Sequence, residues 1–320
     1  MNVYMATDYL STTDSYRVQK TIERPIFFEG TGLHSGAQTK IRLLPAPANH
    51  GIVFVRKDLS GDWRILAHYD AVVSTRMATS LGFKNRPEVR VETVEHLMAA
   101  LYATGITNAL IETWGQEIPI LDGSASMFVE AILKAGIEFQ PFTHPVLRVT
   151  KPIIVYHDGT VCELIPRDRL RLTTSVDFPH PSIGLQTFAL ELTPGSFRNQ
   201  VARARTFGFS SDIEKLRAAN LALGASIENV LAFSPEGILN PEGARYPDEC
   251  VRHKLLDAIG DLALCGCWIE GELVSFRGGH SIHSKLLRSL NAFRTHWVMI
   301  PSAPFAAPLR REFAHRRAVL

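Results

Sequence analysis

The sequence predicts an α+β fold made of two similar halves. Two pairs of segments repeat at one offset along the chain: Val94-Glu95-His96 corresponds to Val251-Arg252-His253, and Asp122-Gly123-Ser124 corresponds to Gly279-His280-Ser281 (253 − 96 = 157 and 280 − 123 = 157). In both halves, strand-like runs precede these segments, and the segments themselves predict a helix, a strand, a turn and a second helix. We therefore expect His96 and His253 to face each other across a pseudo-two-fold seam, where binding sites tend to form.

In the first half, strand-like runs separated by turn residues cover residues 26–28, 39–44 and 51–55. A helix is predicted next, with Thr93 as its N-cap and Gly105 at its end, because apolar residues from Val94 to Leu101 recur with helical spacing. A strand over residues 109–112 and a helix over residues 124–134 follow, with Gly136 as the stop signal. Residues 141–145 begin and end with proline and are predicted to form a linker.

The second half is predicted to repeat this plan. Strand-like segments cover residues 151–156, 161–165 and 170–176, and an amphipathic helix covers residues 212–222. A long helix over residues 248–264 begins at Asp248 and stops at Gly266; a strand over residues 272–276 and a helix over residues 281–291 complete the half. The predicted domain limits are a flexible lead-in (1–20), an N-terminal domain (21–143), a C-terminal domain (144–300) and a tail (301–320).

The composition is typical of a soluble globular protein, with 46% hydrophobic and 21% charged residues among 320. A formal net charge of +2 without a basic block argues against nucleic acid as a partner. The N-terminus lacks a signal-peptide pattern, and no run of about 18 apolar residues predicts a membrane span. The four cysteines follow neither a disulfide framework nor a zinc motif, so we expect them to be buried and reduced, in a cytoplasmic protein.

A metal site is the first chemical hypothesis. His253, Asp257 and Asp261 follow one another at intervals of four and therefore share a face of the predicted helix. Such a face also occurs as a solvated polar surface with a His–Asp hydrogen bond. With His96 from the other half, however, His253 and Asp257 complete the three protein ligands that a catalytic zinc site uses. Iron(II) would suit the same ligands.

Two further residues have the chemistry of an acid–base pair. Glu95 could accept a proton from water activated by the metal, or it could be an ordinary first-turn acid favoured by the helix dipole. His280 follows two glycines at a helix start and could protonate a leaving amine, with Asp261 orienting it; the alternative is a helix-entry histidine without a role. The remaining histidines that we considered lack a partner at comparable spacing, so we do not expect them to bind metal: His34, His157, His180 and His283.

The segment Arg205-Thr206-Phe207-Gly208-Phe209 precedes the predicted amphipathic helix. Thr206 could donate a hydrogen bond to a developing oxyanion, and Phe207 could line a pocket. The alternative is a strand end that packs into the core. Neither a phosphate-binding loop nor an H-E-x-x-H motif is present, so the sequence does not support those two common site classes.

Seven stretches together resemble the UDP-3-O-acyl-N-acetylglucosamine deacetylase family, the zinc enzymes of the committed step in lipid A synthesis. They span residues 22–290 and read, in order, FEGTGLHSG, TVEHLMAALYATGITNALIE, EIPILDGSA, SVDFPHP, RARTFGF, VRHKLLDAIGDL and GGHSIHSKLL. The resemblance implies two similar domains, each a β-sheet layer packed on two helices, with the active site at their junction. It also implies an insert in each domain, the second near residues 209–232 forming an apolar passage for an acyl chain.

The resemblance implies roles for individual residues. His96, His253 and Asp257 would bind zinc. Glu95 would be the general base and His280 the general acid, with Asp261 behind it. Thr206 would contact the oxyanion, Lys254 the phosphates of the nucleotide, and Phe207 the substrate.

The implied reaction releases acetate from UDP-3-O-(3-hydroxyacyl)-N-acetylglucosamine. We expect a monomer whose partner is this small molecule, with transient contact to a membrane surface through the acyl chain or the basic tail. The sequence departs from the family at Ala244, Cys250 and Thr160 and at Ser281-Ile282-His283. Two alternatives stay open: a divergent paralogue that deacetylates another acylated nucleotide-sugar, and a non-catalytic regulatory relic.

Overall fold

The computed structural model describes residues 17–305, and its first half is built on a five-stranded sheet. The strand order is β2-β3-β9-β4-β5. The strands are β2 (Ile26–Thr31), β3 (Gln38–Pro45), β4 (Ile52–Arg56), β5 (Arg64–Leu66) and β9 (Ala109–Trp114). Only β4 and β9 pair in parallel; the other neighbours are antiparallel.

The second half repeats this sheet. Its order is β12-β13-β20-β14-β15, again with one parallel pair, β14 with β20. The strands are β12 (Ile153–His157), β13 (Thr160–Ile165), β14 (Arg171–Phe178), β15 (Gly184–Glu191) and β20 (Glu272–Phe276). In both sheets the strand that arrives last in the chain inserts between the two hairpins, so the expected duplication is confirmed at the level of topology.

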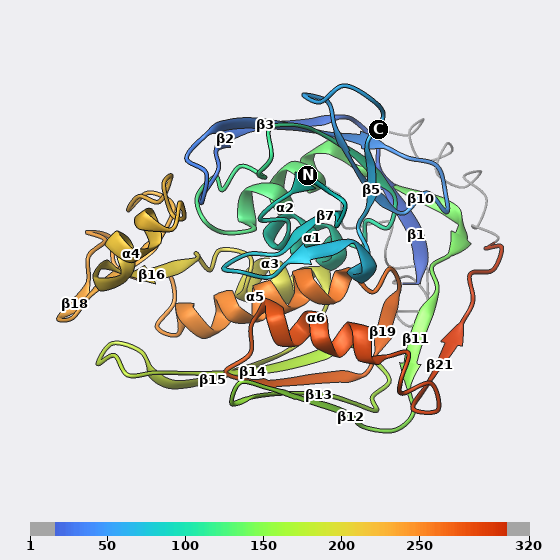
Figure 1. The fold of residues 1–320 in the computed structure, drawn as a ribbon. Coiled ribbons are helices and arrows are strands. Elements are labelled where there is room, and N and C mark those ends of the chain that lie inside the picture. Colours follow the sequence, from blue (N-terminus) through green and yellow to red (C-terminus); the bar gives the residue numbers. More distant parts are fainter. Residues whose placement is uncertain (1–16, 306–320) are drawn as a thin grey trace, which may run out of the picture.

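Four helices lie between the two sheets and form the middle of the molecule (Figure 1). They are α1 (Glu95–Thr104), α2 (Ser126–Ala135), α5 (Glu249–Ala263) and α6 (His280–Ser289). Every residue of α1 is buried, because α2 and α5 both pack against it. The result is the predicted α+β architecture, with one hydrophobic core that includes residues of both halves.

Glycine sets how closely the two halves approach. A Cβ atom at Gly260 in α5 would overlap the backbone carbonyl of Glu95 at the start of α1. The absence of a side chain there lets the backbones of the two helices touch directly. This contact places the first turn of α1 beside the centre of α5.

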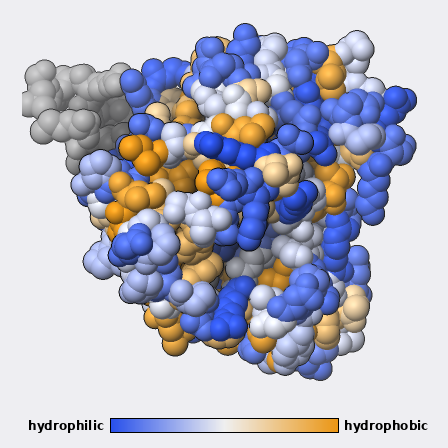
Figure 2. All heavy atoms as spheres, turned by 60° about the vertical axis from the view of Figure 1, so that its left-hand side comes forward, coloured by the Kyte–Doolittle hydropathy of each residue, from blue (hydrophilic) through white to orange (hydrophobic). Residues whose placement is uncertain are grey.

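Each half carries an insert at the same place. It lies between the fourth strand of the large sheet in chain order (β5 or β15) and the first central helix of that half (α1 or α5). After β5 and a 3-10 turn η1 (Tyr69–Ala71), the first insert is the sheet β6 (Val72–Ser74), β7 (Ser80–Phe83) and β8 (Arg86–Val91). After β15 and α3 (Pro194–Gln200), the second insert holds β16 (Phe207–Phe209), η2 (Ser210–Asp212), α4 (Ile213–Ala218), β17 (Leu231–Ser234) and β18 (Gly237–Ile238). The second insert lies at the left of Figure 1. Figure 2 brings that side forward and shows hydrophobic patches among hydrophilic ones.

Two sheets of two and three strands complete the fold. β1 (Val18–Ile22) pairs with β10 (Ile137–Thr143), and β11 (Val146–Val149) lies between β19 (Trp268–Glu270) and β21 (Trp297–Ile300). All four cysteines are free and buried, as expected. None of the helices within residues 17–305 combines the length and the apolar character that crossing a membrane requires.

The predicted N-cap of the first central helix is wrong. α1 begins at Glu95 with Val94 in the cap position, and Thr93 has a positive φ of 56°. The Thr93 hydroxyl instead donates a hydrogen bond to Glu117 Oε1 over 2.8 Å. A buried acceptor from a distant loop therefore replaces the local capping bond that the pattern predicted.

Three predicted boundaries also need correction. The proposed linker over residues 141–145 is largely strand, because residues 141–143 lie in β10, which pairs with β1 and also makes a bridge from Phe142 to Pro304. Residues 18–20 of the predicted lead-in belong to β1, while residues 1–16, like residues 306–320 of the tail, lie outside the described residues. The amphipathic helix is shorter than predicted, because Asn220 and Ala222 adopt positive φ.

Candidate active site

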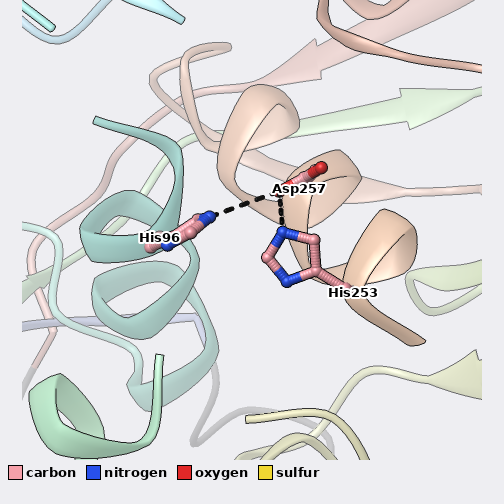
Figure 3. A group of neighbouring side chains, drawn as sticks. All are labelled: His96, His253 and Asp257. Atoms are coloured by element: carbon pink, nitrogen blue, oxygen red, sulfur yellow. Dashed lines mark ion pairs between the residues drawn. The ribbon is translucent and has the colours of Figure 1, made fainter. Parts of the chain in front are cut away.

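The contact between α1 and α5 brings His96, His253 and Asp257 together (Figure 3). The nearest carboxylate oxygen, Asp257 Oδ1, lies 3.3 Å from His253 Nε2 and 3.6 Å from His96 Nε2. The two imidazole rings are nearly perpendicular, with centroids 4.9 Å apart. One potential ligand atom from each side chain thus lies within 4.8 Å of the others, and all three side chains are buried.

The hydrogen bonds around this group leave one carboxylate oxygen of Asp257 without a hydrogen-bond partner among the described residues. His253 Nδ1 lies 3.0 Å from the carbonyl of Ala204, which directs Nε2 toward Asp257. Lys254 Nζ donates to Asp257 Oδ2 over 2.7 Å, yet Asp257 Oδ1 is buried and has no hydrogen-bond partner among the described residues. A buried carboxylate oxygen of this kind is costly unless a cation or donor satisfies it. The residues therefore fit a bound cation.

The protonation states of His253 and Asp257 also suit the binding of a cation. Burial lowers the pKa of His253 to about 4, so its imidazole is neutral near pH 7. Burial raises the pKa of Asp257, but Lys254 and His253 oppose this effect and hold the pKa well below its ordinary value. Neutral imidazole and ionised carboxylate are the forms that bind divalent metals, and this donor set suits zinc and iron(II) alike.

Glu95 lies next to the three potential ligands at the start of α1. Its Oε2 atom accepts a hydrogen bond from the backbone N–H of Thr79 over 3.0 Å. Its Oε1 atom lies 3.6 Å from His280 Nε2. Burial raises the pKa of Glu95 above 4.5, although the charges of His280 and His96 act in the opposite direction. A carboxylate with a raised pKa is suited to accept a proton.

The pKa of His280 is also raised, but neighbouring charges rather than burial are the cause. Burial lowers its pKa, but the charges of Asp261 and Glu95 outweigh burial and raise it to about 9. Asp261 Oδ2 lies 2.9 Å from His280 Nδ1, which leaves Nε2 facing Glu95. A carboxyl group and an imidazole whose pKa values are both raised, and which lie side by side, have the properties of a base and an acid.

The segment that carries Thr206 and Phe207 passes next to His253, through the Ala204 carbonyl and the Phe207 ring. The backbone of Thr206 bridges the halves: its N–H donates to Gly123 and its carbonyl accepts from Leu231, both over 2.8 Å. The Phe207 ring lies 6.3 Å from the His253 ring between centroids. Thr206 and Phe207 are half-buried, so the segment runs along the edge of the site rather than deep in the core.

Lys254 lies closer to the potential metal ligands than the sequence suggested. Its ammonium group forms an ion pair with Asp257, and only 18% of its side chain is exposed. Burial lowers the pKa of Lys254, but Asp257 more than compensates and raises it, so the side chain is charged. The expected contact to the phosphates of a nucleotide stays a prediction.

Sequence reasoning missed residues that support the site. Asp261 also accepts hydrogen bonds from the hydroxyl of Thr79 over 2.6 Å and from His283 Nδ1 over 2.8 Å. His283 is three residues after His280, and this spacing, which places both on one helix face, was an available signal. Thr79 comes from the first insert and left no local signal.

His34 is a second residue whose position could not be read from local spacing. Its Nε2 atom is buried and has no partner among the described residues. Its backbone carbonyl accepts from Leu223 of the second insert over 3.1 Å, and its own N–H donates to Glu117 Oε1 over 2.9 Å. The loop that carries His34 thus ties the first half to the second insert.

Comparison with known proteins identifies relatives over most of the chain. The family model described as UDP-3-O-acyl N-acetylglycosamine deacetylase matches residues 19–292. A UDP-3-O-acyl-N-acetylglucosamine deacetylase from Myxococcus xanthus is 43% identical over 284 residues, which cover 89% of this chain and 90% of that protein. A protein of the same name from Brucella melitensis is 42% identical over 283 residues, covering 88% of this chain and 98% of the relative.

Proposed function

The chain belongs to the UDP-3-O-acyl N-acetylglycosamine deacetylase family, and we propose that it removes the N-acetyl group of a UDP-3-O-acyl-N-acetylglucosamine in lipid A synthesis. The products are acetate and the free amine. The observation that carries this proposal is the buried His96, His253 and Asp257 group, which lies directly beside the Glu95–His280 pair. Amide hydrolysis needs a Lewis acid, a proton acceptor and a proton donor in one place: the first three residues would hold a metal ion as the Lewis acid, and Glu95 and His280 would accept and donate the proton.

We propose that His96, His253 and Asp257 hold one zinc ion. Two observations support this assignment: Asp257 Oδ1 has no hydrogen-bond partner among the described residues, and the His253 imidazole is neutral. When bound there, zinc supplies Lewis acidity that polarises the acetyl carbonyl and makes water more acidic. Lys254 neutralises part of the charge on Asp257 through Oδ2 and leaves Oδ1 for the metal.

Glu95 is the proposed proton acceptor. The backbone N–H of Thr79 holds its Oε2 atom, so Oε1 is the oxygen directed toward the reacting groups. Burial raises the pKa of Glu95, which makes it a stronger base than an exposed carboxylate. The positive charge of the neighbouring His280 opposes the effect of burial and favours the ionised form of Glu95.

His280 is the proposed proton donor to the departing glucosamine nitrogen. Asp261 accepts the Nδ1–H and fixes the ring so that the second N–H, on Nε2, faces the site. A pKa of about 9 keeps the imidazole protonated at neutral pH. The departing amine therefore leaves in neutral form, since expulsion of an unprotonated amide nitrogen is unfavourable.

The substrate contacts form a further part of the proposal. Thr206 donates its hydroxyl to the developing oxyanion, Phe207 packs against the sugar, and Lys254 contacts the phosphates. The second insert would take the acyl chain. An aromatic group at its base supports this: the Phe207 and Phe178 rings lie 5.4 Å apart, and Phe209 and Phe233 continue the group.

The remaining expectations concern where and how the protein works. Four free, buried cysteines support a reducing, cytoplasmic location. Transient contact with a membrane surface is supported by exposed apolar side chains of the second insert: Leu223, Ile227, Ile238 and Leu239. We propose that the protein acts as a monomer.

The direct test is acetate release from UDP-3-O-(3-hydroxyacyl)-N-acetylglucosamine, before chelation, after chelation and with zinc restored. We expect release to disappear on chelation and to return with zinc. Glu95→Gln is the matched variant: it should retain one metal per chain but lose on the order of 10²–10⁴-fold in kcat, the contribution of a positioned base. Turnover that survives chelation, or a fully active Glu95→Gln variant, would contradict the proposal.

A further inference from the structure

Asp261 shares one carboxylate oxygen between two histidines. Its Oδ2 atom lies 2.9 Å from His280 Nδ1 and 2.8 Å from His283 Nδ1, while Oδ1 accepts the hydroxyl of Thr79 over 2.6 Å. An ionised carboxylate has no proton to donate, so both histidines must carry a hydrogen on Nδ1. The Thr79, His280 and His283 side chains thus provide three donors to a single carboxylate.

His283 is held in place from its other side as well. The residue is fully buried, and its Nε2 atom lies 3.3 Å from Ser275 Oγ in β20. A Cβ atom at Gly278 would overlap Ser275 Oγ and approach His283 Nε2 to 3.1 Å, so glycine leaves the space that this pair occupies. The imidazole is therefore not a side chain that merely fills the core, because both ring nitrogens meet polar groups.

We propose that His283 is a positioning residue for the reaction, which fixes Asp261 from the side opposite Thr79 and thereby orients His280. This inference rests on the proposed function, in which His280 donates a proton. Nothing in the sequence resemblance assigns a role to His283, and the structure does not include it among the potential metal ligands.

The physical reason is the rotational freedom of a carboxylate. With His280 as its only strong partner, Asp261 could turn about its terminal torsion and carry the imidazole with it. Donors on both oxygens, from His283 and Thr79, fix the carboxylate plane. The His280 ring is then held with Nε2 3.6 Å from Glu95 Oε1. A misplacement of about 1 Å at a reacting group can cost ~10²-fold in rate.

The charged and titratable groups around the two histidines are few. His283 faces Asp261 from α5, and Cys162 from β13 lies behind Ser275 with its pKa raised by burial to about 12, so it stays a neutral thiol. His280 interacts with the charges of Asp261, Glu95 and Asp257. His34 is also close enough to His280 for the two to interact. Among these groups, Asp261 alone contacts both imidazoles.

The test compares two replacements of His283. His283→Leu removes the donor at similar volume, whereas the Nδ2 atom of His283→Asn can take the place of the imidazole Nδ1. We expect His283→Leu to lower kcat about 10- to 100-fold, in line with ~10²-fold for a misplaced group, with KM little changed. His283→Asn should recover most of kcat.

The pH profile gives a second readout. Without His283, Asp261 has one donor fewer and attracts the proton of His280 more strongly, so the basic limb of kcat/KM should move to higher pH in His283→Leu and return in His283→Asn. The control is Leu290→Ala, which opens a cavity at the C-cap of the same helix, seven residues after His283. It should lower the unfolding midpoint and leave kcat unchanged where the protein is folded.

These outcomes separate the inference from the function on which it rests. No acetate release by the metal-loaded wild-type protein would overturn the proposed function. The inference would be overturned instead if the wild-type protein releases acetate and the kcat of His283→Leu equals that of the wild type. It would also be overturned if the kcat of His283→Asn is as low as that of His283→Leu. Should His283→Leu not fold, nitrogen-15 NMR of the histidines in the wild-type protein still decides. Hydrogen on His283 Nδ1 is expected, and a neutral ring protonated on Nε2 only would contradict the proposal.

Discussion

At the scale of single residues, the site depends on two groups whose charges support each other. Glu95 and His280 lie 3.6 Å apart, and each is buried in a place where alone it would lose its charge. Asp261 adds a further negative charge behind His280 and makes the protonated imidazole the stable form. The positive charge of His280 favours the ionised form of Glu95, and the charge of Glu95 in turn favours the protonated imidazole.

The pH dependence of kcat/KM follows from these shifts. His280 must be protonated to act as the acid, so activity should fall as pH rises through about 9. Glu95 must be ionised, so activity should fall as pH drops through a value above 4.5. In Asp261→Asn the charge that raises the pKa of His280 is gone while burial remains, so the basic limb should move well below 9.

The measurement is a pH–rate profile of wild-type protein and Asp261→Asn at saturating zinc, with circular dichroism at each pH to confirm that both are folded. A basic limb at the same pH in both proteins would exclude His280 as the group that titrates there. An acidic limb at the ordinary pKa of a glutamate would similarly exclude the buried Glu95 as the group that titrates there.

The residue-scale predictions came from spacing within single segments. His253 and Asp257 are four apart on one helix, and His96 occupies the equivalent position of the other half, so their proximity followed from periodicity and repeat. The Thr79–Asp261 bond joins residues 182 apart, in an insert and a helix. No local pattern encodes a contact of that kind, which is why Thr79 was missed.

At the scale of elements, the close contact of α1 with α5 determines the site geometry. The two helices carry all three potential metal ligands and Glu95. Gly260 is one turn after Asp257, at the point where α5 meets the Glu95 backbone. The site therefore requires glycine at a position without any chemical function.

A Gly260→Ala variant tests this directly. The added Cβ would overlap the Glu95 carbonyl, so the helices must separate, and we expect a loss of about 1–3 kcal/mol in the free energy of unfolding from overpacking. Zinc affinity and kcat should fall with it, because His96 moves away from His253 and Asp257.

Gly195→Ala is the matched control, since a Cβ at Gly195 in α3 meets nothing within 4 Å. Denaturant unfolding and zinc titration of both variants give the comparison. Equal stability and equal zinc affinity of Gly260→Ala and Gly195→Ala would show that the helix contact does not set the site.

Element boundaries were predictable where the signal is local and failed where tertiary contacts decide. Gly105 ends α1 with a φ of 83°, as the C-terminal glycine pattern predicts. The start of the same helix was misplaced, because Glu117 attracts the Thr93 hydroxyl away from a capping bond. β10 was taken for a linker because its partner, β1, lies more than a hundred residues earlier in the chain.

At the scale of the whole molecule, the fold is a duplication whose two copies meet through their helices. The two sheets have the same order and the same single parallel pair. The sequence offset of 157 residues predicted the duplication and the facing of His96 and His253, whereas the strand order and the parallel pair are known only from the structure. The inserts could not be predicted in shape, because their short strands pair across turns with weak patterns.

The duplication explains why one site forms rather than two. The first half contributes His96 and Glu95 from α1, and the second half contributes His253 and Asp257 from α5. The position equivalent to Glu95 is occupied by Arg252, and the position equivalent to His280 is Gly123. Each half therefore carries only part of the chemistry, and we propose that neither domain would be active alone.

The central claim is that one metal ion joins the two halves, and the most direct measurement is the coordination of zinc in the purified protein. X-ray absorption and metal analysis should be made on wild-type protein and on His96→Ala. We predict one zinc per chain in the wild-type protein, with two imidazole nitrogens at about 2.0–2.1 Å and a carboxylate oxygen, and one imidazole fewer in His96→Ala. Zinc bound through cysteine sulfur, or a coordination shell that His96→Ala leaves unchanged, would contradict the account.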